Sequence, residues 1–490
     1  MLCFRSYKQP EIVPVDYDVI IIGGGISGLY ASYKLSDHEK PLKVALFEKD
    51  DHLGGKILTK KYDNFLIEYG PLRFETGVQS KVMKLFYQLG VEVEPVVGLS
   101  QSETMPNENL MTDEEKELFK EDQSSLGYSY ATRIMLMALK KVLQNQWDFE
   151  FISIHESDLE IRKSILKKHG KFNGKHLYEY GILDVFKKVL SPECLRYVIQ
   201  EGYFYYMIDK NPNAAEHICI LLDILEALRW EFVSVKHGVQ SVVDKLYDCL
   251  HEKIDITLNT CLMKIEELTP HYKLTFGNGQ IKICDHVILT VPPECLSRID
   301  GISHIIKPIL KKHLILVELF KIFVIVENPP WNEDKNTEVV SQFPCREIMT
   351  YIDESSNEGM IMFYGDERYR KYWFAVDSSI ITEEQKREQL KVKIEENLKI
   401  MYPKSETWNI KVIELNDWIN SSREQKGVYL WKSGINCQET IQKVSSFSMA
   451  KQSKKGIHIC GETFSEYQCF MEGSIRSTEK VVSSILHLYK

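Results

Sequence analysis

Three glycines near the start of the sequence have the spacing of a phosphate-binding turn. Gly23, Gly25 and Gly28 form a G-x-G-x-x-G pattern, and Ile26 and Ser27 complete it. Such a turn brings backbone close to a pyrophosphate, and the N–H groups at the start of the next helix stabilise its charge. The pattern predicts a dinucleotide site to which all five residues contribute, and it leaves NAD and FAD as alternatives.

Three charged residues have types suited to chemistry at such a site. Glu48 comes twenty positions after Gly28, where a carboxylate accepts hydrogen bonds from a ribose. Lys321 interrupts an apolar strand, and burial there would disfavour its charged form; a solvent-facing position is the alternative. Arg73, in IEYGPLRFE, offers a planar pair of donors matched to a carboxylate; a surface or phosphate-binding arginine is the alternative.

The elements around these residues favour an α/β fold. A buried strand over 18–22 precedes the glycine turn, a helix runs from the turn through Leu35, and KVALFE follows as a second strand. Residues 103–230 have amphipathic, helical periodicity. KLTFGNGQIKI predicts a hairpin and DHVILTVP a second buried strand. Three more strand-like stretches (314–331, 347–352 and 359–365) predict a separate mixed sheet.

Composition limits the class of protein. The chain has 490 residues, 44% of them hydrophobic and 27% charged, which indicates an ordinary globular protein of two or three domains. The net charge of -9 argues against nucleic acid or an anionic membrane as a partner. Eleven scattered cysteines without a C-x-x-C pair fit a reducing compartment and predict no metal site. No secretory signal or membrane span is visible, so a soluble, cytoplasmic protein is expected.

Several segments, in order along the chain, resemble the flavin-containing amine oxidases, a family that includes monoamine, polyamine and L-amino-acid oxidases. They are EKDDHLGGKI (48–57), KHGVQSVVDKL (236–246), CDHVILTVPPECL (284–296) and GIHICGETFSEYQCFMEGSIRS (456–477). The resemblance implies FAD rather than NAD and a Rossmann-like FAD-binding domain that is discontinuous in sequence.

The resemblance also implies which residues contact FAD. Glu462 corresponds to an acid that binds the ribityl chain, and the helix beginning at Met471 faces the flavin pyrimidine oxygen. Val428 stands where covalent family members have cysteine, so the flavin is expected to be non-covalent. The remaining predicted contacts are Gly54, Gly55, Lys56, Gly70, Pro71, Leu72, Arg73, Met263 and Gly461.

Other matched positions concern catalysis. Lys321 matches a family lysine that bridges water to flavin N5 and is important for reoxidation. Tyr429 and Phe470 match two aromatic positions that form a cage in front of the flavin, with Trp431 as a further lining residue; core packing is the alternative for the pair.

The sequence departs from the family at three places in the flavin site. Lys56 replaces an arginine, and a lysine lacks the planar fork that grips phosphate. Cys469 replaces the glycine that usually precedes the aromatic residue, and Thr478 replaces the glycine that usually follows Ser477. These departures concern the details of flavin contact.

GPLR resembles the segment whose arginine pairs with the substrate carboxylate in L-amino-acid and tryptophan oxidases. Those enzymes add a tyrosine hydroxyl from a segment resembling FPCREIMTY, but here Met349 and Thr350 fall at that place, and only a shifted register would bring in Tyr351. We therefore expect oxidative deamination of an L-amino acid to the 2-oxo acid, ammonia and hydrogen peroxide. A polyamine or monoamine oxidase, or a flavin-binding scaffold without oxidase activity, is the alternative.

The expected architecture has three parts. The FAD-binding domain comprises residues 16–57, 236–298 and 450–490, the mixed-sheet substrate domain 58–102 and 299–449, and the helical insertion 103–235. The expected partners are a small amine or amino acid and molecular oxygen, and a homodimer is left open.

Overall fold

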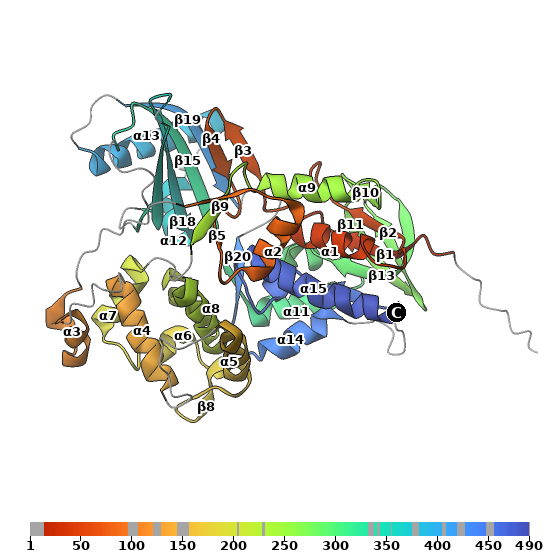
Figure 1. The fold of residues 1–490 in the computed structure, drawn as a ribbon, viewed down its shortest axis with the longest axis horizontal. Coiled ribbons are helices and arrows are strands. Elements are labelled where there is room, and N and C mark those ends of the chain that lie inside the picture. Colours follow the sequence, from red (N-terminus) through yellow and green to blue (C-terminus); the bar gives the residue numbers. More distant parts are fainter. Residues whose placement is uncertain are drawn as a thin grey trace, which may run out of the picture.

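The computed structural model describes residues 14–96, 106–120, 129–144, 156–202, 205–227, 231–331, 338–340, 344–353, 355–374, 382–403, 408–418, 427–446 and 455–489. Figure 1 shows a seven-stranded sheet with its helices on the right, a five-stranded sheet at the upper left and a group of helices below it. The predicted α/β class is confirmed. We retain the three predicted domains as a proposal; their boundaries at 102/103 and 449/450 lie outside the described residues.

The seven-stranded sheet is mixed. Its parallel strands are β10 (Asp255–Thr257), β2 (Val44–Phe47), β1 (Tyr17–Ile22), β13 (Ile281–Leu289) and β21 (Ile457–Ile459). Beyond β13 follow the antiparallel strands β12 (His271–Phe276) and β11 (Leu262–Leu268). Strands from both ends of the chain are thereby neighbours in one sheet.

Strand β13 changes partner along its length. Its first residues pair with β12 across the turn at Gly277, as the hairpin prediction requires, whereas Val287 to Leu289 pair with β21. The hairpin strand and the second buried strand predicted from the sequence are therefore one continuous strand. The sequence pattern changes along it because its first part is half exposed and its last part is buried on both faces.

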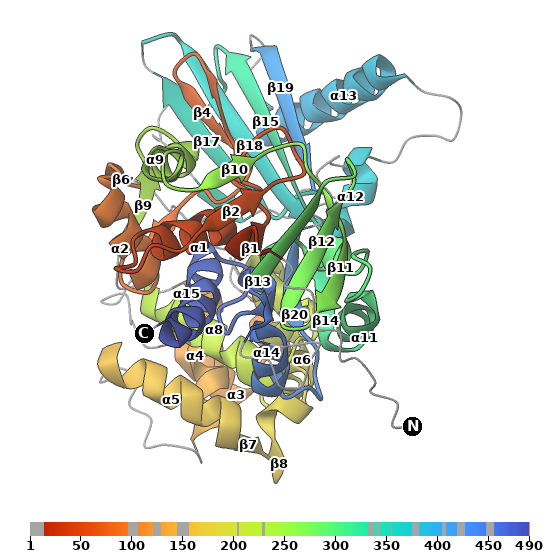
Figure 2. The same ribbon diagram turned by 90° about the vertical axis from the view of Figure 1, so that its right-hand side faces the viewer.

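Helices cover both faces of this sheet (Figure 2). On one face, α1 (Ile26–Ser36), α9 (Gln240–Leu250) and α15 (Met471–Leu488) share a core with Val19 and Ile21 of β1. On the other face, α11 (Ser303–His313) and α14 (Cys437–Ser445) share a core with Ile20 and Ile22. The alternation of a buried strand therefore fixes which helices contact which residues.

Every pair in the five-stranded sheet is antiparallel, so mixed pairing is confined to the larger sheet. Its order is β16 (Glu338–Val340), β17 (Glu347–Asp353), β18 (Glu358–Asp366), β15 (Leu319–Glu327) and β19 (Asn409–Asp417). Helices α12 (Glu367–Phe374) and α13 (Glu383–Met401) cover one face, to which Phe320 and Ile322 point. The other face packs against the hairpin of β3 (Thr59–Tyr62) and β4 (Phe65–Glu68).

The helical part of the chain has a hydrophobic core of its own, formed by residues between 111 and 225. Its helices are α3 (Asp113–Lys120), α4 (Tyr130–Leu143), α5 (Glu156–His169), α6 (Ile182–Phe186), α7 (Pro192–Glu201) and α8 (Ala214–Ala227), with a short hairpin of β7 (Lys171–Phe172) and β8 (Lys175–His176). The next strand, β9 (Phe232–Val235), pairs with β5 (Phe74–Glu75) and β6 (Val93–Pro95). Strand β9 thus leads the chain out of the helices and back to the earlier strands.

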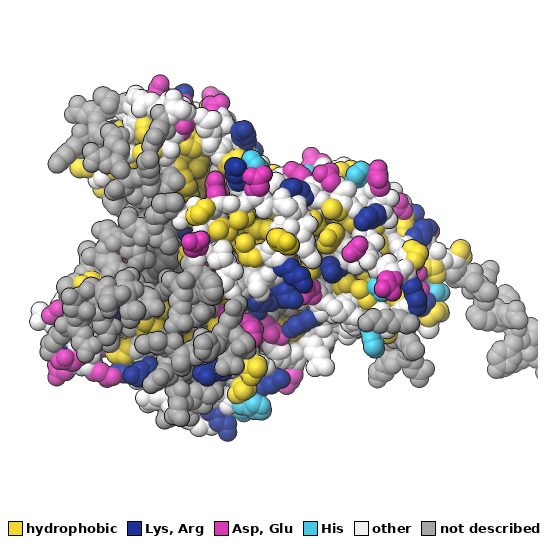
Figure 3. Space-filling view, viewed as in Figure 1, with side chains coloured by type: hydrophobic (Ala, Val, Ile, Leu, Met, Phe, Trp, Pro, Cys, Tyr) yellow, Lys and Arg dark blue, Asp and Glu magenta, His cyan; other side chains and the backbone are white. Residues whose placement is uncertain are grey.

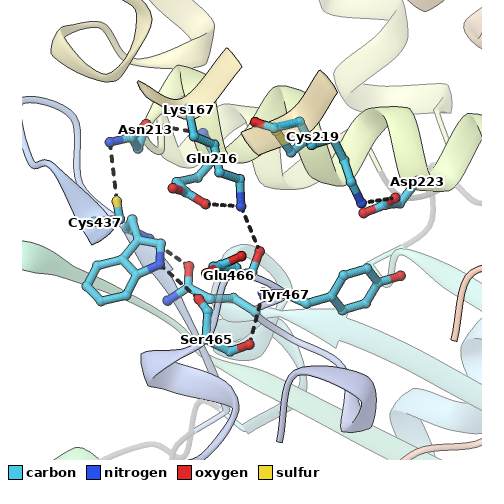
Figure 4. A network of polar contacts seen from close by, with 12 residues as sticks. Lys167, Asn213, Glu216, Cys219, Asp223, Cys437, Ser465, Glu466 and Tyr467 are labelled. Atoms are coloured by element: carbon cyan, nitrogen blue, oxygen red, sulfur yellow. Dashed lines mark hydrogen bonds and ion pairs between the residues drawn. The ribbon is translucent and has the colours of Figure 1, made fainter. Parts of the chain in front are cut away.

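Buried ion pairs join the helices to the C-terminal segment (Figure 4). Lys167 of α5 lies 2.6 Å from a carboxylate oxygen of Glu216 in α8, and its ammonium donates to the backbone carbonyl of Glu466 at 3.2 Å. Lys163 lies 2.7 Å from a carboxylate oxygen of Asp223. Because a lone buried charge is costly, these pairs hold α5 against α8, and Lys167 also ties both helices to the backbone at Glu466.

The remaining short elements are α2 (Ser80–Leu89), α10 (Pro293–Leu296), β14 (Leu314–Val317) and β20 (Val428–Trp431), the last two forming an antiparallel pair. Among the described residues, none of the helices combines the length and apolar character needed to cross a membrane. On the face drawn in Figure 3, the basic and acidic side chains that are described are interspersed.

Candidate active site

A cavity of about 560 Å³ lies where these parts meet. One end is lined by residues at the carboxyl ends of β1, β2, β13 and β21, the usual place for a ligand in a parallel sheet. The other end is lined by β15, β17 and β18 and by the β5 region. The cavity brings together all the predicted site residues except Gly28, which lies directly behind the turn: Gly23, Gly25, Ile26, Ser27, Glu48, Gly54, Gly55, Lys56, Gly70, Pro71, Leu72, Arg73, Met263, Lys321, Tyr429, Gly461, Glu462, Phe470 and Met471.

The glycine turn leaves no room for side chains. Gly23 has φ +106°, and a Cβ on Gly28 would lie 1.9 Å from the Gly23 carbonyl oxygen. Thr290, directly after β13, donates to that same carbonyl at 3.0 Å, which fixes the turn against the sheet. Gly25 begins α1 and pairs with Gly54, so two glycine segments lie side by side at the cavity wall. This arrangement fits a pyrophosphate lying against backbone N–H groups.

Glu48 is held by the backbone around it. Its carboxylate accepts from the N–H of Gly24 at 2.5 Å and from the N–H of Asp50 at 2.9 Å. These bonds fix the carboxylate at the end of β2, and each oxygen keeps a lone pair for a ribose hydroxyl. Its position agrees with the predicted ribose contact, which stays a prediction.

Lys56 contacts an acid of the cofactor site. Its ammonium donates to the Gly427 carbonyl at 2.6 Å and lies 3.3 Å from a carboxylate oxygen of Glu462. The other oxygen of Glu462 accepts from the Cys469 N–H at 2.9 Å. Lys56 therefore connects the GGK segment to the C-terminal segment, a contact that its motif did not suggest.

Cys469 has a left-handed backbone conformation with φ +73°. That region favours glycine, and the cost for another residue is of order 1–3 kcal/mol. The glycine usual at this place in the family therefore has a conformational reason, and cysteine retains the turn at a cost. Thr478, the other departure, is buried in α15 and donates to the Ser474 carbonyl at 2.7 Å.

The C-terminal segment ends in a helix whose start is tied to its neighbour. Glu472, in the first turn of α15, is fully buried and accepts from the N–H of Val82 at 2.9 Å, at the start of α2. Arg476 donates to the same carboxylate at 2.7 Å. These contacts fix the start of α15, which faces the cavity at Met471.

Tyr429 of β20 and Phe470, directly before α15, both line the cavity. The Tyr429 hydroxyl donates to Glu294, and burial, followed by that bond, raises the pKa of the phenol. Trp431 is different: it is 1% exposed, donates to the Ser465 carbonyl at 3.2 Å, and does not belong to the described cavity wall. Its predicted lining role was wrong: although Trp431 shares a face of β20 with Tyr429, it lies farther along the strand and packs in the core under the seven-stranded sheet.

Lys321 lies on the buried face of β15, so the solvent-facing alternative does not hold. Its ammonium donates to the carbonyls of Glu68, at 3.0 Å, and Gly70, at 2.6 Å. Burial, only partly offset by the nearby carboxylates, lowers its pKa to about 8. The rings of Tyr364 and Trp418 stand 5.6 and 5.8 Å from the ammonium.

Arg73 extends into the substrate end of the cavity with 10% of its side chain exposed. Its guanidinium lies above the Phe232 ring at 5.6 Å and 3.9 Å from a carboxylate oxygen of Glu347. Glu347 and Glu75 also line the cavity, at 1% and 3% exposure. Sequence reasoning missed both acids: Glu75 is two residues from Arg73 but sits in an ordinary strand pattern, and only the fold brings Glu347 to Arg73.

Glu75 is buried beside other charges. Burial, then Asp223, raises its pKa to about 7, against the opposing influence of Arg73 and a hydrogen bond from Gln79. A carboxyl of this kind titrates near neutral pH, which is a frequent property of functional sites.

The tyrosine that was not found at the expected place in the sequence has a candidate substitute on a neighbouring strand. Met349 lines the cavity, whereas the Tyr351 hydroxyl donates to the Met349 sulfur at 3.5 Å, away from the described cavity wall. Tyr364 of β18 pairs in register with Glu347 and does line the cavity, beside Lys321. Tyr364 therefore lines the substrate end of the cavity without the shifted register that Tyr351 would need.

Comparison with known proteins identifies the family. A family model described as flavin containing amine oxidoreductase matches residues 26–486. The chain belongs to this family. Solved structures of putrescine oxidase share its fold: the wild type bound to putrescine has a TM-score of 0.59 at 17% identity, covering 96% of this chain and 99% of that one. A single-substitution variant has a TM-score of 0.61 at 17% identity, covering 97% and 99%.

Curated relatives match over shorter stretches. Coproporphyrinogen III oxidase of Staphylococcus aureus is 24% identical over 300 residues, 56% of this chain and 60% of the relative. The Bacillus subtilis enzyme of the same name is 40% identical over 311 residues, which are 59% of this chain and 63% of the relative. Pseudooxynicotine dehydrogenase of a Pseudomonas species is 36% identical over 91 residues, which are 19% of this chain and 18% of the relative. The chain therefore spans less than two thirds of these relatives.

The predicted cofactor, FAD, is confirmed by the family. The cavity fits it: no Cβ is tolerated at Gly28, whereas a Cβ on Gly461, at φ +140°, would meet nothing within 4 Å. Gly28 is needed for the packing of the turn, whereas Gly461 leaves its backbone exposed toward a ligand. The glycine turn, Glu48 and Glu462 would hold the dinucleotide from opposite ends of the chain.

Proposed function

We propose that this oxidoreductase removes the α-amino group of an L-amino acid, giving the 2-oxo acid, ammonia and hydrogen peroxide. Arg73 carries the proposal, because it lines the substrate end of the cavity with only 10% of its side chain exposed. A guanidinium offers two parallel donors to a carboxylate, which would fix the substrate Cα.

The remaining roles are divided among residues of the same cavity. Bound FAD would supply the acceptor for the hydride from Cα and the route by which two electrons reach oxygen. Tyr429 and Phe470 exclude water and orient the amine, and Tyr364 offers a hydroxyl near the carboxylate. Lys321 holds a proton near the reacting centre, with its ammonium anchored on the Glu68 and Gly70 carbonyls. The imine product hydrolyses to the 2-oxo acid and ammonia.

The experiment is to replace Arg73 and compare an L-amino acid with the amine that lacks its carboxylate. Arg73→Met should lower kcat/KM for the amino acid at least ~100-fold, as expected when one partner of a buried charge pair is lost. Turnover of the amine should change much less. The matched control is Arg73→Lys, which keeps the charge without the planar fork. Its kcat/KM for the amino acid should lie between those of the wild type and of Arg73→Met.

A second candidate is oxidation of an amine without a carboxylate, and Glu347 favours it. Its contact with Arg73 shows that the arginine already has an acidic neighbour. Equal loss of activity on both substrates in Arg73→Met, or no loss on the amino acid, would reject carboxylate recognition and favour this candidate.

A further inference from the structure

We propose that Glu294 is a positioning residue, which acts through Tyr429 by turning the phenol hydroxyl away from the amine that reacts. The inference rests on the role that the proposed function gives to Tyr429 and Phe470, and it applies equally to an amino acid and to an amine without a carboxylate. Glu294 had no role in the sequence prediction, although it lies within the family-like segment 284–296.

The hydrogen bond joins two segments that are far apart in sequence. Tyr429 of β20 is 2% exposed and lines the cavity, and its hydroxyl donates to a carboxylate oxygen of Glu294. Glu294 lies in α10 and is half-buried. Its sequence neighbours Pro293 and Cys295 line the cavity, but Glu294 does not belong to the described cavity wall. The Tyr429 hydroxyl therefore points out of the cavity.

Helix α10 holds the carboxylate in a fixed place. Pro293 begins the helix with a restricted φ, and the Ser297 hydroxyl donates to the Glu294 carbonyl at 2.7 Å. Leu296 is fully buried in the same hydrophobic core as Tyr429. Burial, followed by the bond to Glu294, raises the pKa of the Tyr429 phenol, so the proton stays between the two side chains. A carboxylate is a stronger acceptor than a neutral group, so this bond fixes the direction of the ring.

The direction of the hydroxyl matters for the chemistry of the site. Amine oxidation requires a neutral amine, and a phenol hydroxyl inside the cavity would donate to the lone pair of that amine. It would also offer a partner to a water molecule. Phe470 has no hydroxyl, so with the Tyr429 hydroxyl bonded to Glu294, neither ring offers a polar group to the cavity. Glu294 thereby keeps this part of the cavity wall apolar.

A set of FAD-loaded variants tests this role. Glu294→Gln keeps a hydrogen-bond acceptor, Glu294→Leu removes it, and Tyr429→Phe removes the hydroxyl; the last two are also combined. The matched control is Glu439→Leu, because Glu439 is likewise an acid in the first turn of a helix, α14, but is exposed and outside the described cavity wall. Each protein is measured by the visible circular dichroism of bound flavin and by the rate of anaerobic flavin reduction with each common L-amino acid and with pentylamine.

Glu294→Leu leaves the phenol without its acceptor, so the hydroxyl turns toward the cavity. We expect flavin reduction to slow at least ~10-fold, as loss of one charge-assisted hydrogen bond allows, and the circular dichroism of the flavin to change with it. In the Tyr429→Phe background the same substitution should cost less than ~3-fold, because no hydroxyl is left without a partner. Glu294→Gln should lose less than Glu294→Leu, since an amide carbonyl still accepts, and Glu439→Leu should resemble the wild type.

The outcomes distinguish this inference from the proposed function. Equal slowing by Glu294→Leu in both backgrounds, or wild-type rates and spectra in Glu294→Leu, would overturn the role of Glu294. Where a variant binds too little flavin for kinetics, flavin content takes the place of the rate in the same comparison. Reduction by pentylamine but by no amino acid would reject carboxylate recognition, and the rates with pentylamine then decide on Glu294. If no probe reduces the wild-type flavin, the proposed chemistry fails for these probes, and circular dichroism alone decides on Glu294.

Discussion

The dinucleotide end of the cavity is lined largely by backbone, whereas the substrate end is lined by charged side chains. At the first, glycines at 23, 25, 54, 55 and 461 bring main chain to the wall. At the second, Arg73, Lys321, Glu75 and Glu347 meet from separate elements, and two of their pKa values lie near neutral pH. From this comparison we expect the grip on the cofactor to depend mainly on backbone shape and the choice of substrate mainly on charge.

The two ends meet at the C-terminal turn. Glu462 contacts Lys56 on the cofactor side, and Phe470 lines the cavity on the way to the substrate side. Lys167 of α5 donates to the Glu466 carbonyl within the same turn. The turn is thus the place where helices of the insertion contact the cofactor segment.

The broadest effect is expected at the backbone end, because loss of flavin would lower every activity of the enzyme. Gly28→Ala would place a Cβ 1.9 Å from the Gly23 carbonyl oxygen, which the turn accommodates only by moving. Such overpacking costs typically 1–3 kcal/mol or more, so we expect at least ~10-fold less bound flavin, read from the ratio of flavin to protein absorbance. Gly277→Ala is the control, since its Cβ would have ordinary contacts at 3.7 Å. If Gly28→Ala kept its full flavin content, binding of the cofactor would not depend on the close packing of the glycine turn.

An intermediate effect is expected at the charged end. Lys321→Met should retain flavin but slow its reoxidation by oxygen ~100-fold, as for loss of one buried donor at a reacting centre. With a pKa of about 8, wild-type Lys321 is charged below pH 8 and neutral above it, so wild-type reoxidation should fall as pH rises through 8. The variant should show no such step.

Stopped-flow mixing of reduced enzyme with oxygen measures this reoxidation. Lys60→Met, at a half-exposed lysine of β3, is the control and should behave as wild type. A pH step that persists in Lys321→Met would assign the titration to another group and weaken the contrast between the two ends.

The smallest effect is expected at the turn between the ends. Cys469→Gly should relieve the left-handed strain at φ +73° and stabilise the fold by ~1 kcal/mol. Cys469→Ala removes the same thiol but keeps a Cβ in the unfavourable region, so it should give no such gain. Thermal unfolding of the flavin-loaded proteins compares them; equal shifts in both variants would mean that the thiol, and not the backbone, sets the cost.

Local sequence was sufficient for the elements at the cofactor end. The strand, turn and helix around Gly23 and the helix from Met471 were predicted within a residue or two, because glycine spacing and apolar periodicity are local properties. The continuity of β13 was missed, since its change of partner depends on where β21 packs. Trp431 was misplaced for a similar reason: it shares a face of β20 with Tyr429, and only the fold shows that the cavity wall includes Tyr429 and not Trp431.

The sequence by itself determined the family, the flavin and the residues whose backbone must approach it, because those demands act on neighbours along the chain. The tertiary structure decided what stands beside Arg73 and Lys321: the acids Glu75 and Glu347, the hydroxyl of Tyr364, and the carbonyls that hold the lysine. Charge acts through space and grows with burial, so residues far apart in sequence set one another's protonation only once the fold has brought them together.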